Sequence, residues 1–485
     1  MEINLELTES INRLTKEFGE PVFYDTKNRL IGVNQIFMAN FFKFIHDPVF
    51  ETTENKFYIY GEDGLWKQKS DNYIIYELGK MIFEHRVAFC EPDLQCKAPA
   101  KILKEIFTML TACAAKKNFF SAPVDRVVHC GNGVLVYDHA VSNWVLKSFS
   151  PDFRSRNSSN IHYNSTAGCP QFIEKLILSA MTEEDADLLQ LYVGQCLIGR
   201  NSSQTFLLLT GTPGGGKSTL CNLIEALIGR HNCTELRLEH MGSRFELQRL
   251  VGKTLLTAKD VKSDFLNSAG AYKLKSLVGN DTMTIESKNR NDSADINGIF
   301  NAIITCNNNL RVAFDGDEDA WRRRILWIKY NNPPPKEKIV DFDKKLLTEE
   351  GSGILNWALE GANKLMKLNG KIPIGQEQKA RIDDLLLESN SINVFVDECV
   401  KPTPTSTVTC SDLLVAFTKY CKNRQWENLP ERVFQKNLPD IMLHKYNAVK
   451  RTDIKNKHNK YNRGYAGFAL ITQEEDCGNP PRMSA

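Results

Sequence analysis

Short apolar runs alternate with helical or polar segments in the middle of the chain, between residues 186 and 330. Strand-like runs are expected at 206–209, 255–256 and 302–305. This alternation is typical of an open α/β sheet. The proline-rich stretch "NNPPPKEK" at 331–338 then ends the pattern. We therefore expect an α/β core over 186–335.

The flanking segments predict further domains. Residues 1–185 mix short amphipathic stretches with hairpin signals, the clearest being "KFYIYGEDGLWKQ", where two aromatic-rich runs flank a turn that contains Gly. The stretch "GSGILNWALEGANKLMKL" has apolar residues at helical spacing, and "NGKIPIGQEQ" has the composition of a linker. The expected units are an N-terminal α+β accessory domain, the core, a helical extension with a linker, a helical and winged-helix domain, and a flexible tail: 1–185, 186–335, 336–389, 390–475 and 476–485.

Composition narrows the class of protein. The 485 residues are 42% hydrophobic and carry a net charge of +2, so we expect a soluble globular chain in which any nucleic-acid surface is a local patch. The thirteen cysteines include no Cys-x-x-Cys pair, which favours reduced thiols. The start of the chain lacks the pattern of a signal peptide, and no apolar run reaches the roughly 18 residues of a membrane span. These features predict a cytoplasmic protein without a membrane partner.

The strongest chemical signal is "TFLLLTGTPGGGKSTLCNLIEALIG", a strand, a Gly-rich turn and a helix that match G-x-x-x-x-G-K-[ST]. Such a turn curls backbone N–H groups around phosphate oxygens at the positive end of a helix. Lys217 is expected to reach the β/γ-phosphates and Ser218 to ligate Mg²⁺, so the predicted cofactors are ATP and Mg²⁺. The predicted nucleotide-binding residues are Gly211, Thr212, Pro213, Gly214, Gly215, Gly216, Lys217, Ser218 and Thr219.

Three later positions are candidates for the rest of the catalytic machinery. Asp260 ends an apolar strand and would lie beside the metal, although an exposed surface acid has the same signature. Asn307 ends a second strand and can orient the attacking water, or it is an ordinary turn residue. The run Arg322 to Arg324 can supply an arginine finger to a neighbouring subunit, or it is a salt-bridged helix end.

Two basic segments are candidates for DNA binding. The segment "AYKLKSLVGNDTMTIESKNRNDSADI" has a hairpin-like pattern from which cations would reach a phosphate backbone. The final unit predicts two helices followed by a basic stretch with two strands, as in a winged helix. A solvated turn and a solvated basic loop are the alternatives. The predicted DNA-binding residues are Lys275, Lys288, Arg290, Lys450, Arg451 and Lys455.

The combined motifs resemble the C-terminal superfamily 3 helicase region of phage, plasmid and poxvirus-type primase-helicases. The likeness rests on the Gly-rich turn, "GNDTMTIESK", "IITCNN", "DAWRRRILWI" and "GSGILNWALEGA". Upstream, "KFYIYGEDGLW", "GNGVLVYD" and "IHYNSTAGCPQFIEKLI" resemble the accessory domain that precedes this core. The resemblance therefore extends over nearly the whole chain and implies an AAA+-type P-loop core with a parallel sheet.

The resemblance also implies a function. It implies a hexameric ring that uses ATP and Mg²⁺ to move along single-stranded or forked DNA during replication of a virus, phage or mobile element. The implied roles are Lys217 and Ser218 for Walker A, Asp260 for Walker B, Asn307 for the sensor, Arg323 or Arg324 for the finger, and Lys288 for the channel hairpin.

The sequence departs from that family at three points. The phosphate loop lacks an asparagine before its Gly-Lys, and the Walker B strand ends in Lys259 and Asp260 instead of two acids. Because no primase domain precedes the helicase region, a separate primase or polymerase is a possible partner. Two other functions remain open: an ATPase that acts as a nucleic-acid-dependent switch or loader, and a non-enzymatic DNA-binding protein.

Overall fold

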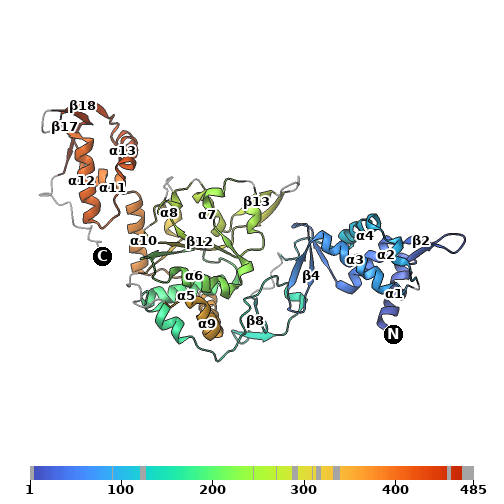
Figure 1. The fold of residues 1–485 in the computed structure, drawn as a ribbon. Helices are drawn as coiled ribbons and strands as arrows, with labels where there is room; N and C mark the ends of the chain where they lie inside the picture. The colour runs from blue at the N-terminus through green and yellow to red at the C-terminus, as the bar shows by residue number, and fades with distance from the viewer. Residues whose placement is uncertain are drawn as a thin grey trace.

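The chain forms three units that follow one another along its length in a computed structural model (Figure 1). The structure describes residues 5–89, 91–120, 127–243, 245–268, 270–286, 293–308, 310–312, 318–330, 339–455 and 460–471. The N-terminal unit and the C-terminal unit lie on opposite sides of a central sheet domain (Figure 1). Within the described residues, no helix combines the length and the apolarity that a membrane crossing needs, and every cysteine is a free thiol.

The N-terminal unit encloses its own apolar core. Its helix α2 has Asn34 as N-cap, whose side chain accepts a hydrogen bond from Phe37 N, and it buries Phe37, Phe41 and Phe42. Strands β4 and β5 pair antiparallel, which confirms the predicted hairpin. Its elements are α1 (Leu5–Phe18), β1 (Val22–Tyr24), β2 (Leu30–Val33), α2 (Gln35–His46), β3 (Val49–Glu51), β4 (Lys56–Tyr60), β5 (Trp66–Lys69), α3 (Asp71–His85), α4 (Ala100–Cys113) and β6 (Ala115–Lys116).

A small antiparallel sheet joins this unit to the central domain. It consists of β7 (Val127–Cys130), β8 (Gly133–Asp138) and β9 (Asn143–Lys147). Its side chains Val128, Leu135 and Trp144 belong to the same apolar cluster as the helices of the central domain. The expected boundary at residue 185 therefore lies within one continuous core.

The central domain is built on a five-stranded parallel sheet in the order β11-β12-β15-β10-β16. Strands β10 and β15 are apolar and buried almost throughout, as expected for a parallel sheet that is covered on both faces. This arrangement confirms the predicted α/β class. The elements are α5 (Glu183–Ile198), β10 (Phe206–Gly211), α6 (Lys217–Ile228), β11 (Cys233–Glu235), β12 (Leu255–Val261), α7 (Ala271–Val278), β13 (Thr282–Glu286), β14 (Ser293–Asn297), β15 (Asn301–Cys306), α8 (Glu318–Arg322) and β16 (Ile325–Tyr330).

Two further helices complete the central domain. Helix α9 (Phe342–Lys367) lies against α5, and a Cβ on Gly361 would approach Gln190 O to 2.0 Å, so only glycine permits this contact. Helix α10 (Gln376–Ser389) covers the sheet, where Gln378 Oε1 accepts a hydrogen bond from Trp327 N at 3.1 Å. The prediction of a linker at 369–378 is wrong at its end, because α10 begins inside it.

The C-terminal unit has a separate apolar core and a mixed helix and strand composition. The two predicted helices and the two predicted strands are confirmed, while α11 and β17 did not appear in the prediction. Strand β19 pairs antiparallel with both β17 and β18. The elements are α11 (Ser391–Cys399), β17 (Val400–Thr409), α12 (Cys410–Asn423), α13 (Glu431–Tyr446), β18 (Arg451–Lys455) and β19 (Tyr461–Leu470).

Candidate nucleotide and DNA sites

The Gly-rich turn lies between the end of β10 and the start of α6. Gly211 has φ +140°, and a Cβ at this position would come within 2.4 Å of Tyr330 O, so the close approach of β16 requires glycine here. The helix begins at Lys217, and its first N–H groups have no partner within the helix. The turn with this helix start therefore forms a cradle of backbone N–H groups of the kind that can hold phosphate groups, here called the phosphate cradle. The Gly-rich turn itself contains Thr212, Pro213, Gly214 and Gly215. Thr219 follows Ser218 at the start of α6.

Lys217 is folded back onto the loop that precedes it. Its Nζ donates hydrogen bonds to Gly211 O at 2.7 Å and to Thr212 O at 3.0 Å, and the residue is only 4% exposed. Burial lowers the pKa of the Lys217 ammonium, and the charge of Asp260 opposes that shift. The cation is thus held at the mouth of the cradle by neutral carbonyl groups, which an incoming phosphate can replace.

Asp260 faces the start of α6 from the neighbouring part of the sheet. Its Oδ2 lies 3.5 Å from Ser218 Oγ, so the two predicted metal ligands are brought together. The backbone of Asp260 has φ +51°, and the pairing of β12 with β15 is irregular between Ala258 and Val261. The Asp260 N–H donates to Thr305 Oγ1 at 2.9 Å. This bulge turns the carboxylate toward the phosphate cradle, as bulges at functional sites often do.

A hydroxyl and a carboxylate suit Mg²⁺ that arrives with a nucleotide. Magnesium is usually held by one or two protein groups together with substrate phosphates and water, rather than by a complete protein cage. Among the described residues, no group of three or more His, Cys, Asp or Glu side chains is placed to hold a metal. The Ser218 hydroxyl and the Asp260 carboxylate have the chemistry that a Mg²⁺ ion arriving with a nucleotide would require.

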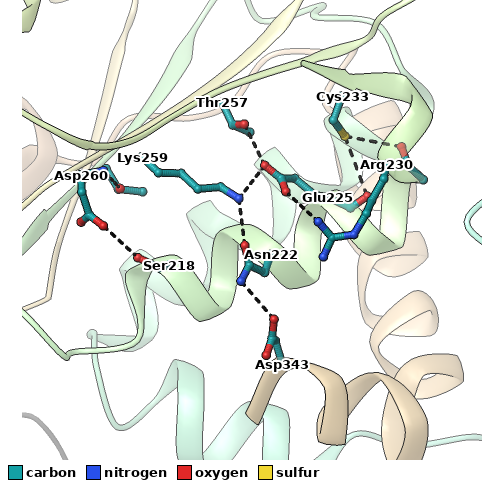
Figure 2. A network of polar contacts seen from close by, with 11 residues as sticks. Ser218, Asn222, Glu225, Arg230, Cys233, Thr257, Lys259, Asp260 and Asp343 are labelled. Carbon is teal, nitrogen blue, oxygen red and sulfur yellow. Dashed lines mark hydrogen bonds and ion pairs between the residues drawn. The ribbon is translucent and has the colours of Figure 1, made fainter. Parts of the chain in front are cut away.

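Lys259 points away from the phosphate cradle into a polar network on α6 (Figure 2). Its Nζ lies 2.8 Å from Glu225 Oε1 and donates to Asn222 Oδ1 at 2.8 Å. Glu225 also accepts a hydrogen bond from Thr257 Oγ1 at 2.8 Å and is 7% exposed. Asn222 in turn donates to Asp343 Oδ2 at 3.0 Å, so the network reaches α9. Lys259 thus ties β12, the strand that bears Asp260, to helix α6.

Replacing Lys259 with methionine is expected to destabilise the chain and to slow the ATP hydrolysis that the sequence predicts. Removing one partner leaves the Glu225 carboxylate buried with less compensation, which costs about 2 kcal/mol of unfolding free energy. A small displacement of Asp260 would reduce turnover by up to about 100-fold. Urea unfolding and an ATPase assay measure the two effects.

Two matched variants test this role of Lys259. Lys259→Arg keeps the cation and should restore turnover, whereas Lys259→Met combined with Glu225→Gln should restore stability alone, because it also removes the buried carboxylate that would keep only Arg230, at 3.6 Å, as its ion-pair partner. Parental turnover in Lys259→Met would contradict a positioning role.

Asn307 follows the strand that lies between the P-loop strand and the Asp260 strand. The strand order places β15 between β10 and β12, so Asn307 emerges at the same sheet edge as Gly211 and Asp260. The side chains of Asn307 and Asn308 are exposed. Cys306, just before them, is buried, with its Sγ 3.1 Å from Val261 O. The exposed amide of Asn307 therefore lies at the carboxyl ends of the strands, the same end of the sheet as Asp260 and the Gly-rich turn.

The three arginines lie at the other end of the strands, where β10 and β16 begin. Phe206 N donates to Arg324 O, so these residues precede β16 at the end where β10 begins. Six strand residues at about 3.3 Å each separate them from their own P-loop by about 20 Å. The three arginines therefore lie too far from the Gly-rich turn of their own chain to contact a phosphate there.

The arginines occupy three different environments. Arg322 forms ion pairs with Asp319 and with Asp383, the latter at 2.7 Å. Arg324 is 7% exposed, donates to Ala320 O, and its pKa is lowered by burial. The Arg323 side chain is exposed and has no ion-pair partner among the residues that the structure describes. Arg322 and Arg323 are both exposed, but of these two only Arg323 has no ion-pair partner among the described residues.

The predicted DNA-binding residues lie in several places. Strands β13 and β14 form the expected hairpin, but Lys288 and Arg290 lie outside the described residues. Lys275 is not on this hairpin: helical periodicity turns it toward α8, where its Nζ lies 5.1 Å from the Trp321 ring centroid. In the C-terminal unit Arg451 pairs with Asp453, and Lys455 Nζ lies 5.5 Å from the ring centroid of Tyr461. Lys450 precedes β18 and is exposed.

Comparisons with known proteins give two findings. A family model described as "Family of unknown function (DUF5906)" matches residues 209–324, from β10 to the residue before β16. The chain is also similar to three apo structures of the NrS-1 C-terminal region, at 14%, 13% and 14% sequence identity. These cover 87%, 89% and 89% of this chain and 96%, 99% and 99% of the other chains, each with a TM-score of 0.45. The functional assignment therefore rests on the geometry of the site itself.

Proposed function

We propose that the chain is an ATP-dependent DNA helicase or translocase of the superfamily 3 type, with an AAA+-type P-loop core that acts as a ring during DNA replication. The observation that carries this proposal is the division of the site between two edges of one sheet. Lys217, Ser218 and Asp260 gather at one edge, and Arg323 is exposed at the other. Each copy of the chain would thus carry the phosphate-binding residues at one end of its strands and Arg323 at the other end. A complete site would form where these two ends of neighbouring copies meet.

ATP hydrolysis is the reaction that these groups would support. Water attacks the γ-phosphorus, the bond to the bridging oxygen breaks, and ADP and phosphate leave. Ser218 and Asp260 would hold Mg²⁺, which would supply neutralisation of the phosphate charge. Lys217 would move from the loop carbonyls to the phosphates, and Asn307 would orient the attacking water. A neighbouring Arg323 would stabilise the charge on the transferring group.

The DNA would be contacted by the β13–β14 hairpin and by the C-terminal unit. Lys288 and Arg290, which follow β13 in the sequence, and Lys275 on α7 are proposed to face a channel, where cations hold the backbone without reading sequence. Lys450, Arg451 and Lys455 are proposed to hold DNA outside the ring. The alternative function, a nucleic-acid-dependent switch or loader, shares the ATPase site but needs neither a ring nor strand separation.

One experiment separates the motor from the alternatives. ATP hydrolysis is measured with and without single-stranded DNA, together with the mass of the assembly in solution. A motor of this type should form a six-fold particle whose hydrolysis rises at least about tenfold with DNA, because the strand organises the ring that completes each site. Hydrolysis by a monomer without dependence on DNA would favour the switch. Absence of any hydrolysis would leave the non-enzymatic DNA-binding protein.

A further inference from the structure

A cavity of 220 Å³ lies in the C-terminal unit where the first turn of α12 meets α13 and the strands β18 and β19. Cys410 and Ser411 line it from α12, while Lys450, Arg463 and Tyr465 line it from the segment of the two strands. The basic stretch that predicted DNA binding contains Lys450, Arg463 and Tyr465, whereas Ser411 had no predicted role. The proposed function uses Lys450 as a DNA contact but assigns no role to the cavity as a whole.

The two cations of the cavity are available for a ligand. Neither Lys450 nor Arg463 has an ion-pair partner in the described part of the chain, whereas neighbouring Arg451 is paired with Asp453. Burial raises the pKa of the Cys410 thiol, and the charges of Lys450 and Arg463 oppose that rise. Their positive potential therefore reaches the first residue of α12, which strengthens the positive end of the helix.

The start of α12 leaves backbone donors free at this position. Thr409 Oγ1 accepts from Asp412 N, and the Asp412 carboxylate folds back onto Thr409, with Oδ2 2.6 Å from Oγ1. These contacts form a capping box, which gives the N–H of Asp412 a partner and hydrogen-bonds its carboxylate to Thr409. The N–H groups of Cys410 and Ser411 have no partner within the helix. The Ser411 side chain is exposed beside them.

Tyr465 supplies an independent indication of a ligand. Its side chain is 0% exposed and lines the cavity, yet its hydroxyl has no hydrogen-bond partner among the described residues. A buried hydroxyl without a partner carries a desolvation cost, and a bound acceptor would remove it. Burial raises the Tyr465 pKa, with added effects of Cys410 and Asp440, so the hydroxyl keeps its proton and can donate.

We propose that this cavity binds one phosphodiester group of a DNA strand, through Lys450, Arg463, the Tyr465 hydroxyl and the first turn of α12. The donors surround the cavity from different elements, as a tetrahedral anion with several acceptor oxygens requires. Because the two cations are also exposed, a phosphate inside a longer strand can enter without passing through the core. The proposal rests on the DNA-binding part of the proposed function and identifies where the C-terminal unit holds the backbone.

The test measures binding of the full chain to a labelled single-stranded oligonucleotide without ATP, by fluorescence anisotropy over a range of salt concentrations. Arg463→Gln is expected to weaken binding about tenfold, as for loss of a charge-assisted hydrogen bond. It should also reduce the salt slope by about 0.7. Lys422→Gln is the matched control, because Lys422 is exposed in the last turn of α12, at the end away from the cavity.

Tyr465→Phe separates a ligand contact from a structural role. The variant keeps the ring in the core and removes only an oxygen without a partner, so the melting temperature should be unchanged or raised. DNA affinity should nevertheless fall about threefold to tenfold. Parental affinity in both Tyr465→Phe and Arg463→Gln would overturn the proposal.

Inorganic phosphate distinguishes the source of the anion. If the two variants lose phosphate binding, measured as a shift in melting temperature, but bind DNA like the parent, the cavity serves a free phosphate and the DNA assignment is overturned. If the parent chain binds no DNA, this proposal and the DNA-binding part of the proposed function fail together. If the parent binds DNA and the variants do so equally well, only this proposal fails.

Discussion

Lys217→Ala should abolish ATP hydrolysis and leave the chain folded. The Lys217 ammonium is held by two neutral carbonyl oxygens and forms no ion pair with any described acid, so its removal breaks no buried charge pair. Burial lowers the pKa of the Lys217 ammonium, because its charged form is partly removed from water. A bound phosphate group would compensate for this desolvation with its negative charge. Loss of one such electrostatic contact at a reacting phosphate lowers turnover by at least about 100-fold.

The measurement compares steady-state ATP hydrolysis and thermal unfolding of the variant and the parent. Lys345→Ala is the matched control, because Lys345 is an exposed lysine on α9. It should keep full turnover, while both variants should unfold close to the parent's melting temperature. Full turnover in Lys217→Ala would remove the nucleotide site from the turn between β10 and α6, and the proposed function with it.

Local patterns predicted the parts of the fold that depend on neighbouring residues. The Gly-rich turn and its flanking strand and helix are contiguous, so their spacing appears directly in the sequence. The hairpins β4–β5 and β13–β14 also pair segments that lie next to each other along the chain. Helix α10 escaped prediction because its buried apolar residues Ile382, Leu385 and Leu386 begin only at the seventh of its 14 residues. Its first turn is held instead by a polar contact from Gln378 to β16.

The candidate site could be predicted as a set of residues but not as a network. Glu225 and Lys259 are far apart in sequence, and only the parallel pairing of the sheet brings them together. One signal could have indicated the pair: Glu225 is the single acid in α6 and lies in its apolar second half, where a buried carboxylate requires a partner. The bulge at Asp260 has no such signal, because it depends on the hydroxyl of Thr305.

The three consecutive arginines show how burial distinguishes residues that a pattern treats alike. Sequence spacing gave no reason to prefer one of them. The structure pairs Arg322 with two acids and buries Arg324 against Ala320, so each already has a structural role. Arg323 lies between them, exposed. We therefore infer that Arg323, rather than Arg324, is the residue that a neighbouring subunit uses.

Arg323→Ala is accordingly expected to lower ATP hydrolysis by about 1000-fold or more, the effect of removing an arginine finger. Nucleotide binding should persist, because the P-loop of each subunit is intact. Arg322→Ala is the control: it breaks exposed ion pairs, which costs about 1 kcal/mol or less of stability, and should keep most of the turnover. Fluorescent-nucleotide titration and steady-state hydrolysis measure the two properties on the same preparations.

Mixing two inactive variants tests whether the arginine acts across a subunit boundary. Lys217→Ala keeps Arg323, and Arg323→Ala keeps its P-loop, so some boundaries in a mixed ring combine an intact cradle with an intact arginine. Hydrolysis should therefore recover on mixing, to a fraction that depends on the ratio of the variants. An arginine that acts within its own chain could give no recovery, and neither could a monomer. Because the sheet places Arg323 about 20 Å from its own P-loop, absence of recovery would contradict shared sites and would favour a switch over a ring motor.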